Sequence, residues 1–182
     1  MPLVYHRGLS CCRLVPVQNG VALIPRSGNT GLVSGSTPDT SGTQAVLSLD
    51  RMAAGFGFDR LNRTVRVGAG MRLSDLNAKL QEHGLFFPID LGADPRLGGM
   101  IATDTGDSRF LRHGDVRPNT LGIVVVLADA AGAVLNLSSP LRKNDTGVDW
   151  TASLSTRPER SALLPNAFST PSLCRDSRRR PF

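Results

Sequence analysis

The chain has 182 residues, and 40% of them are hydrophobic, which is enough for one domain with a core or for two small subdomains. Its net charge of +6 is uneven, because segment 151–182 carries six arginines against two carboxylates and the remainder is nearly neutral. This distribution, with a single Trp and a single Tyr, argues against nucleic-acid binding.

The three cysteines, Cys11, Cys12 and Cys174, match neither a disulfide framework nor the spacing of a zinc site. We therefore expect no metal and a reducing compartment, and we assign the chain to the cytoplasm. No apolar run approaches the roughly 20 residues of a transmembrane helix. The N-terminus also lacks the pattern of a signal peptide, so the sequence predicts a soluble protein with no transmembrane segment.

In chain order, residues 14–17 suit an edge strand, and the aliphatic run 21–24 predicts a buried strand that ends at a proline. The loop 25–32 follows. It holds two glycines, two hydroxyls and an arginine: Arg26, Ser27, Gly28, Thr30 and Gly31. Glycine allows close backbone approach, and consecutive amides suit an anion such as a diphosphate. An ordinary exposed turn is the alternative, because the loop matches neither a Walker A nor a dinucleotide motif.

The middle of the chain predicts a meander followed by a helix. Strands at 45–50 and 63–67 flank alternating aromatics at 56 and 58, and the second strand alternates polar with apolar residues. A helix follows with Leu73, Leu76 and Leu80 on one face. Ser74 or Asp75 is expected to cap its start, and Gly84 its end.

Later in the chain, small residues dominate the segment 98–106. It suits either a glycine-rich loop or a tight helical turn that lets a flat ligand approach its backbone. The aliphatic run 121–129 and the run 133–137 are separated by Ala131-Gly132, which predicts a hairpin.

A Rossmann unit is not expected. Gly68 and Gly70 follow a strand, and Asp90 lies twenty residues further on, as in a dinucleotide fingerprint. However, Leu73 stands where the third glycine belongs, and Asp90 does not close a clean second strand.

Taken together, several stretches resemble the FAD-binding domain of the vanillyl-alcohol oxidase (PCMH-type) superfamily, in its D-lactate and D-2-hydroxyglutarate dehydrogenase-like branch. They are 25–32, 67–70, 87–93, 98–106, 112–114, 127–129 and 141–147. Their order and spacing carry the resemblance, which covers about residues 18–150. Residues 1–17 form a poorly defined N-terminus.

The resemblance implies an α+β fold of two α/β subdomains with FAD between them. It implies that the loop amides hold the pyrophosphate and that later small residues line the rest of the cofactor. The implied FAD-binding residues are Pro25, Arg26, Ser27, Gly28, Asn29, Thr30, Gly31, Leu32, Asp90, Gly92, Ala93, Gly98, Gly99, Ala102, Thr103 and Gly106. Branches with covalent flavin carry histidine where this chain has Thr30, so the implied FAD is non-covalent.

The implied activity is oxidation of a 2-hydroxy acid of the D-lactate or D-2-hydroxyglutarate type, by hydride transfer to FAD. Substrate groups come mainly from a C-terminal domain of the family, so we name no catalytic residue among Arg26, Arg112 and His113. A non-catalytic nucleotide-binding fragment and an inactive gene remnant are the alternatives. Self-association into a homo-oligomer is compatible with the sequence.

The chain departs from the family pattern in two ways. Asp104 and Asp107 stand where the family usually has Asn and Gly, and a carboxylate near the cofactor weakens binding unless it is paired. Residues 151–182 match nothing in the family, so we predict an incomplete domain with a disordered basic tail. Read in a shifted frame, 156–165 can encode the family's next segment, which suggests a frameshift after about Trp150. A basic interaction tail is the alternative.

Overall fold

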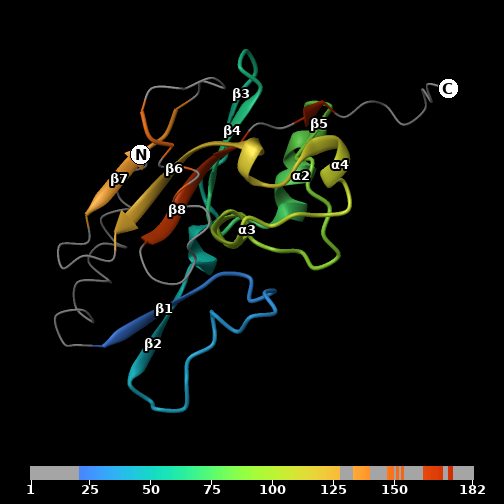
Figure 1. Cartoon of the computed structure of the whole chain (residues 1–182). Coiled ribbons are helices and arrows are strands. Elements are labelled where there is room, and N and C mark those ends of the chain that lie inside the picture. Colours follow the sequence, from blue (N-terminus) through green and yellow to red (C-terminus); the bar gives the residue numbers. More distant parts are fainter. Residues whose placement is uncertain are drawn as a thin grey trace.

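The computed structural model describes residues 21–127, 133–139 and 147–149, the single residues 151 and 153, and the backbone of 162–169 and 172–173. Helices and strands are mixed along the chain, as predicted. Figure 1 shows a two-stranded ribbon beneath a larger sheet, with the helices gathered on one side of that sheet. The strand expected at 14–17 lies outside the described residues.

The two-stranded ribbon holds the strand predicted before the glycine-rich loop, but the strand runs through Pro25 to Arg26 and none of its residues is fully buried, so the predicted end at the proline and the predicted burial were wrong. β1 (Ala22–Arg26) pairs in parallel with β2 (Gln44–Ser48), so that Arg26 lies opposite Ser48. The strand predicted at 45–50 is therefore present. Its placement in a meander was wrong, because β2 pairs with β1 and not with the strands that follow it.

The larger sheet has five strands in the order β3-β4-β8-β6-β7, and each neighbouring pair is antiparallel. Its members are β3 (Gly57–Asp59), β4 (Thr64–Gly68), β6 (Thr120–Leu127), β7 (Val134–Leu137) and β8 (Ala162–Ser169). The β3–β4 turn is held by the Asp59 carboxylate, which accepts hydrogen bonds from the amides of Leu61 and Asn62. The predicted β6–β7 hairpin is confirmed, and residues 128–132 lie outside the described part.

The centre of this sheet differs from the sequence prediction. The backbone of β8 lies between β4 and β6, although residues 151–182 were expected to be disordered. Val124 pairs with Asn166 and Val126 with Leu163, so two residues of β8 lie opposite one of β6. Pro165 falls within this bulge, where its missing N–H removes no regular ladder bond.

The predicted helix is confirmed as α2 (Leu73–Gln81), with Leu73, Leu76 and Leu80 buried. Its cap differs from the prediction, because no side chain of its own first turn caps it. Instead the Asp94 carboxylate accepts hydrogen bonds from the Ser74 amide at 3.0 Å and the Ser74 hydroxyl at 2.8 Å. The helix is followed by Gly84 at φ +68°, as a glycine C-terminal signal predicts.

The remaining elements are short. They are η1 (Asp50–Ala53), β5 (Leu85–Phe86), α3 (Leu97–Thr103), α4 (Phe110–His113), η2 (Arg117–Asn119) and β9 (Ser172–Leu173). For the segment 98–106, the sequence left open a glycine-rich loop or a tight helical turn. Residues 98–103 are helical in α3, and residues 104–106 follow the helix. The backbones of β5 and β9 pair as a small separate ribbon.

The core explains why β6 is aliphatic almost without interruption. Ile123 and Val125 belong to the large cluster that includes the buried leucines of α2, whereas Val126 packs with Leu49 and Met52. Since β6 buries residues on both faces, its sequence lacks the usual alternation of apolar and polar residues.

The pair of glycines that mimics a dinucleotide motif has a packing role. A Cβ at Gly68 would lie 2.0 Å from the Met52 carbonyl oxygen, and one at Gly70 would lie 2.3 Å from that of Leu49. These positions therefore need glycine so that η1 can lie directly against the end of β4.

Candidate functional site

A cavity of about 660 Å³ lies between the loop that follows β1 and helix α3. This volume is within the range of small-molecule and cofactor sites. Its lining consists of Pro25, Ser27, Gly28, Asn29, Thr30, Gly31, Leu32, Val33, Gly35, Ser36, Leu49, Leu91, Gly92, Ala93, Pro95, Arg96, Gly98, Gly99, Met100, Ala102, Thr103 and Thr105.

The loop on one side of the cavity, residues 27–36, is shaped by local hydrogen bonds. Asn29 has φ +52°, a left-handed conformation that Asn tolerates well, and its side-chain oxygen accepts a hydrogen bond from the Ser36 hydroxyl. The loop is anchored where it leaves β1, since the Leu49 amide donates to the Arg26 carbonyl at 2.9 Å. The sequence therefore forms a wide turn whose backbone faces the cavity.

The deepest part of the cavity joins this loop to α3. The Ser27 hydroxyl is buried and has no hydrogen-bond partner among the described residues. A Cβ at Gly99 would lie 3.4 Å from the Ser27 Cβ, and one at Gly28 would lie 3.4 Å from the Arg96 amide nitrogen. These two glycines therefore let the loop lie close against the start of α3. The Cβ position of Gly31 has nothing within 4 Å, so the backbone there is open to an oxyanion ligand.

Helix α3 presents small residues to the cavity for two separate reasons. Gly98 is required for packing, because a Cβ there would lie 2.7 Å from the Cβ of Ala69, and its amide donates to the Ala69 carbonyl at 2.8 Å. Gly99, in contrast, keeps the cavity wall free of side chain. Thr103 bonds the Gly99 carbonyl at 2.9 Å, which turns its hydroxyl back toward the helix.

The structure brings most of the predicted cofactor-binding residues together at this cavity. The exceptions are Arg26, Asp90 and Gly106, which do not line it. The Asp90 carboxylate pairs with Arg109 at 2.9 Å instead. Sequence reasoning missed Val33, Gly35, Ser36, Leu49, Leu91, Pro95, Arg96, Met100 and Thr105. Leu49 and Met100 are buried apolar residues, and such residue types indicate a place in the hydrophobic core and not a binding role.

The two carboxylates that depart from the family pattern are both paired. Asp104 ends α3 in a left-handed conformation and accepts a hydrogen bond from Arg117. Asp107 accepts hydrogen bonds from the amides of Asp90 and Arg109. Neither lines the cavity, so the expected weakening of cofactor binding by free carboxylates does not follow from this geometry.

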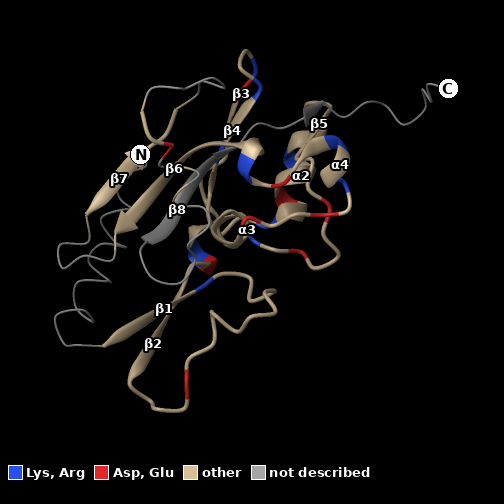
Figure 2. Ribbon diagram, in the orientation of Figure 1, with Lys and Arg blue, Asp and Glu red and all other residues tan. Residues whose placement is uncertain are grey.

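Charge is scarce in the cavity. Figure 2 shows that the loop after β1 is almost free of charged residues; Asp39 is the one charged residue between 27 and 43. Of the described residues that line the cavity, Arg96 alone carries a charge. The guanidinium of Arg96 is itself paired with the Asp50 carboxylate at 2.9 Å.

The Asp94 carboxylate beside this wall is held in its ionised form. Burial raises its pKa, but hydrogen bonds from the backbone and hydroxyl of Ser74, together with Arg72 at 3.6 Å, outweigh this effect and place the pKa below its ordinary value. The link fixes the start of α2 to the segment that leads into α3.

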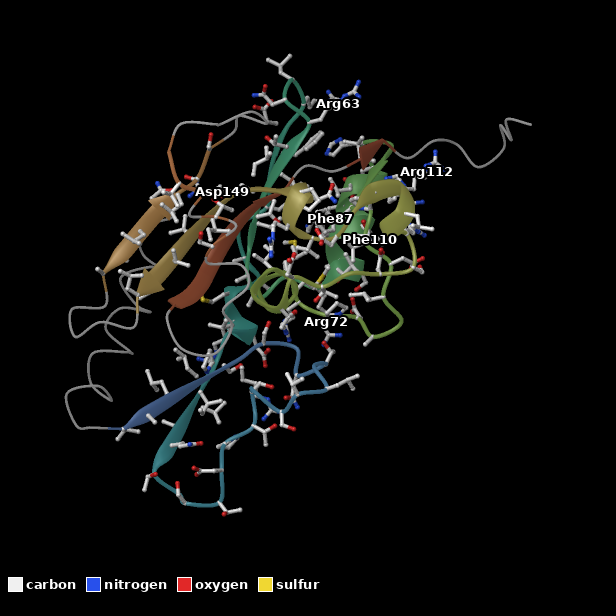
Figure 3. The ribbon with its side chains drawn as sticks, in the orientation of Figure 1. Arg63, Arg72, Phe87, Phe110, Arg112 and Asp149 are labelled. Atoms are coloured by element: carbon white, nitrogen blue, oxygen red, sulfur yellow. The ribbon has the colours of Figure 1, made fainter. Side chains whose placement is uncertain are left out.

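Arg112 and His113, considered above as catalytic candidates, lie at a different place. They belong to α4, on the side of the molecule away from β7 (Figure 3), and they line a separate cavity of about 340 Å³ with Phe86 and Arg109. The His113 ring meets Phe86 edge-on at 5.8 Å. These two residues therefore do not share the lining of the larger cavity.

Neither a metal-binding cluster of His, Cys, Asp or Glu nor a helix able to cross a membrane occurs in the part of the chain that the structure describes. The α+β fold and a cavity lined by glycines, hydroxyl groups and apolar side chains are those of a nucleotide-cofactor-binding domain. The chain matches the FAD binding domain family over residues 14–138, and it belongs to that family.

Individual relatives agree with this assignment. A zebrafish protein named D-2-hydroxyglutarate dehydrogenase, mitochondrial, is 40% identical over 134 residues, which are 72% of this chain and 24% of the relative. A D-2-hydroxyglutarate dehydrogenase of Xanthomonas citri pv. viticola is 36% identical over 132 residues, 71% of this chain and 27% of that protein. The chain thus spans about a quarter of these relatives.

The fold has a close match among solved structures. A structure of alkyldihydroxyacetonephosphate synthase superposes with a TM-score of 0.76 at 19% identity, covering 90% of this chain and 29% of that one. At this identity the match shows the fold alone. The cavity fits the family's cofactor, because the unpartnered Ser27 hydroxyl and the open backbone at Gly31 suit the diphosphate of FAD.

Proposed function

We propose that this chain is the FAD-binding part of a flavin-dependent oxidoreductase that oxidises a 2-hydroxy acid of the D-2-hydroxyglutarate or D-lactate type, and that it holds FAD non-covalently. The observations that carry the proposal are the unpartnered buried hydroxyl of Ser27 and the open space around Gly31, both in the cavity lining of a member of this family.

The residues have separate roles in this proposal. The backbone of 27–31 binds the diphosphate, and the small residues of α3 allow the rest of the cofactor to lie against the helix. The residues proposed to hold FAD are the predicted ones that line the cavity: Pro25, Ser27 to Leu32, Gly92, Ala93, Gly98, Gly99, Ala102 and Thr103. When bound, FAD supplies the hydride-accepting chemistry. Thr30 offers the flavin no histidine for covalent attachment.

The test uses the purified 182-residue chain. We expect FAD to remain with the protein through gel filtration, with absorbance near 450 nm from the flavin itself. Because the binding is non-covalent, denaturation by acid should then release it as free FAD. Anaerobic addition of D-2-hydroxyglutarate or D-lactate then reports whether the bound flavin is reduced. Loss of all FAD on the column would contradict the proposal.

A non-catalytic nucleotide-binding fragment is the second candidate. It is favoured by the share of the relatives that the chain covers, about a quarter of their length. This candidate predicts that the chain retains FAD and that neither D-2-hydroxyglutarate nor D-lactate bleaches the flavin. Dithionite should still bleach it.

The proposed setting is less specific. A cytoplasmic, reducing location remains the prediction from the cysteine pattern, although the zebrafish relative is named mitochondrial. A small-molecule 2-hydroxy acid is the proposed partner, and self-association remains a prediction that sedimentation of the purified chain can check.

A further inference from the structure

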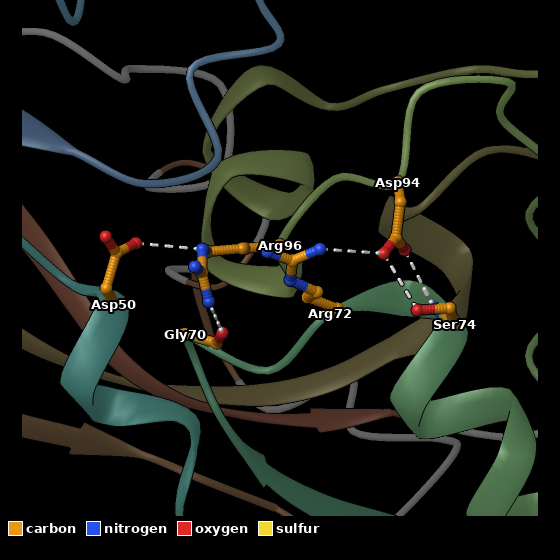
Figure 4. Close-up of polar contacts among 6 residues, drawn as sticks. All are labelled: Asp50, Gly70, Arg72, Ser74, Asp94 and Arg96. Atoms are coloured by element: carbon orange, nitrogen blue, oxygen red, sulfur yellow. Dashed lines mark hydrogen bonds and ion pairs between the residues drawn. The ribbon is translucent and has the colours of Figure 1, made fainter.

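Arg96 has an unusual place in the cavity wall. It immediately precedes α3, and its side chain is only 15% exposed. Its Nε contacts an Asp50 carboxylate oxygen at 2.9 Å, and one terminal nitrogen donates to the Gly70 carbonyl at 2.6 Å (Figure 4). One guanidinium therefore joins η1 to the turn between β4 and α2.

The backbone of Arg96 is fixed by the same turn. It forms an isolated bridge with Arg72, and the amides of the next two residues donate to the Met71 carbonyl at 3.0 Å and the Ala69 carbonyl at 2.8 Å. The position of the guanidinium is thus set from both ends. A side chain held in this way can act as a rigid support for neighbouring backbone.

The backbone that it supports belongs to the phosphate-binding loop. A Cβ added at Gly28 would lie 3.4 Å from the backbone nitrogen of Arg96 and 3.6 Å from its Cγ. A second connection runs through Asp50, because the adjacent Leu49 amide bonds the Arg26 carbonyl at the start of the loop. The backbone and the start of the Arg96 side chain therefore lie beside Gly28, while its guanidinium contacts η1, which follows the Leu49 anchor of the loop.

We propose that Arg96 is a positioning residue for the diphosphate site: its fork between Asp50 and Gly70 holds Gly28 and the loop 26–31 in the conformation that binds the diphosphate of FAD. This inference rests on the proposed function and adds a residue to it. A purely electrostatic role is the competing explanation, since Arg96 is the charged residue of the described lining.

Substitution at Asp50 separates the two explanations. Asp50→Asn removes a negative charge near the site, so an electrostatic role predicts tighter anion binding. The positioning role predicts weaker binding, because a neutral amide holds the guanidinium less firmly than a carboxylate does. Asp50 is more than half exposed, so the variant is expected to fold.

The experiment measures the affinity for FAD and for ADP, and the midpoint of thermal unfolding without ligand. We expect Arg96→Met to lose about tenfold in both affinities and Asp50→Asn about threefold. Arg96→Lys should not restore binding, because one ammonium cannot reproduce a fork to two partners. Arg72→Met is the matched control: this neighbouring arginine is 54% exposed, pairs with Asp94 and does not line the cavity (Figure 4).

Each outcome decides the question. Native-like affinities in Arg96→Met, tighter binding in Asp50→Asn, full rescue by Lys, or an equal loss in Arg72→Met would each overturn the positioning role while leaving the proposed function intact. Failure of the native chain to bind either FAD or ADP overturns the proposed function, and the inference with it. If Arg96→Met does not fold, the sign of the Asp50→Asn effect still decides.

Discussion

Arg117 donates a hydrogen bond to the carboxylate of Asp104, and the two residues join the end of α3 to the start of η2. The Asp104 side chain is only 18% exposed and has a left-handed backbone. Its other carboxylate oxygen is buried with no hydrogen-bond partner among the described residues. The pair therefore compensates a charge that would otherwise be costly so close to the cofactor cavity.

The first prediction concerns this pair. Arg117→Met leaves the Asp104 carboxylate buried without its cation, so the free energy of unfolding should fall by about 1–3 kcal/mol. Adding Asp104→Asn should recover part of that loss, because the remaining group is neutral. Urea unfolding of the two single variants and the double variant measures the coupling. If the changes in unfolding free energy of the two single variants add up to that of the double variant, the predicted coupling between Arg117 and Asp104 is wrong.

The second prediction concerns the hydroxyl of Ser27. Since this group has no hydrogen-bond partner among the described residues, Ser27→Ala should leave the unfolding midpoint of the cofactor-free chain unchanged or slightly raised. The same change should weaken FAD binding roughly ten- to hundredfold, as expected for one hydrogen bond to a charged group. Titration of flavin fluorescence measures it.

Ser41→Ala provides the control for that titration. Ser41 lies in the same connection between β1 and β2 but is exposed and bonds Asp39 outside the cavity lining. Equal effects of the two substitutions on FAD affinity would argue against a diphosphate at Ser27.

The predictable parts of this fold are those with strong local periodicity. The leucines of α2 and the aliphatic run of β6 specify their elements unambiguously, and the loop at 25–32 was found from glycine and hydroxyl spacing. The partner of a strand is not a local property. β2 was therefore predicted as a strand but assigned to the wrong sheet.

Long-range contacts also account for what sequence reasoning missed at the site. Nothing near Arg96 in the chain indicates that its guanidinium reaches Asp50 and Gly70, which are 46 and 26 residues away. The glycines at 68 and 70 suggested a ligand motif, whereas their real neighbour is the backbone of η1. Residue type alone cannot separate packing from binding in such cases.

The third prediction is a pH dependence at Asp94. Because the hydrogen bonds of Ser74 and the charge of Arg72 outweigh burial, the folded pKa lies below the ordinary value of about 3.9. A depressed carboxyl pKa stabilises the fold above the unfolded pKa, and this contribution is lost as the pH falls through the folded pKa. The stability difference between native chain and Asp94→Asn should therefore shrink below about pH 4.

Chemical denaturation at a series of pH values between about 3 and 7 measures this difference. Asp75→Asn is the comparison, since it removes a carboxylate from the same helical turn without removing the partner of Ser74. A difference for Asp94→Asn that stays constant across the range, or that grows in acid, is the contrary result.

The fourth prediction concerns β8 and its place at the centre of the sheet. Ala167 lies opposite Val67 of β4 and Ile123 of β6, so Ala167→Pro removes a ladder hydrogen bond between two buried strands. The carbonyl left without its partner should cost about 1–3 kcal/mol, seen as a lower midpoint in thermal and urea unfolding. A chain ending after Leu173 keeps both β8 and β9 and should retain the native midpoint.

If Ala167→Pro is as stable as that shortened chain, then residues 162–169 do not hold the sheet together. The hypothesis of a frameshifted, non-structural tail would then be favoured, and resequencing the locus would be the next measurement.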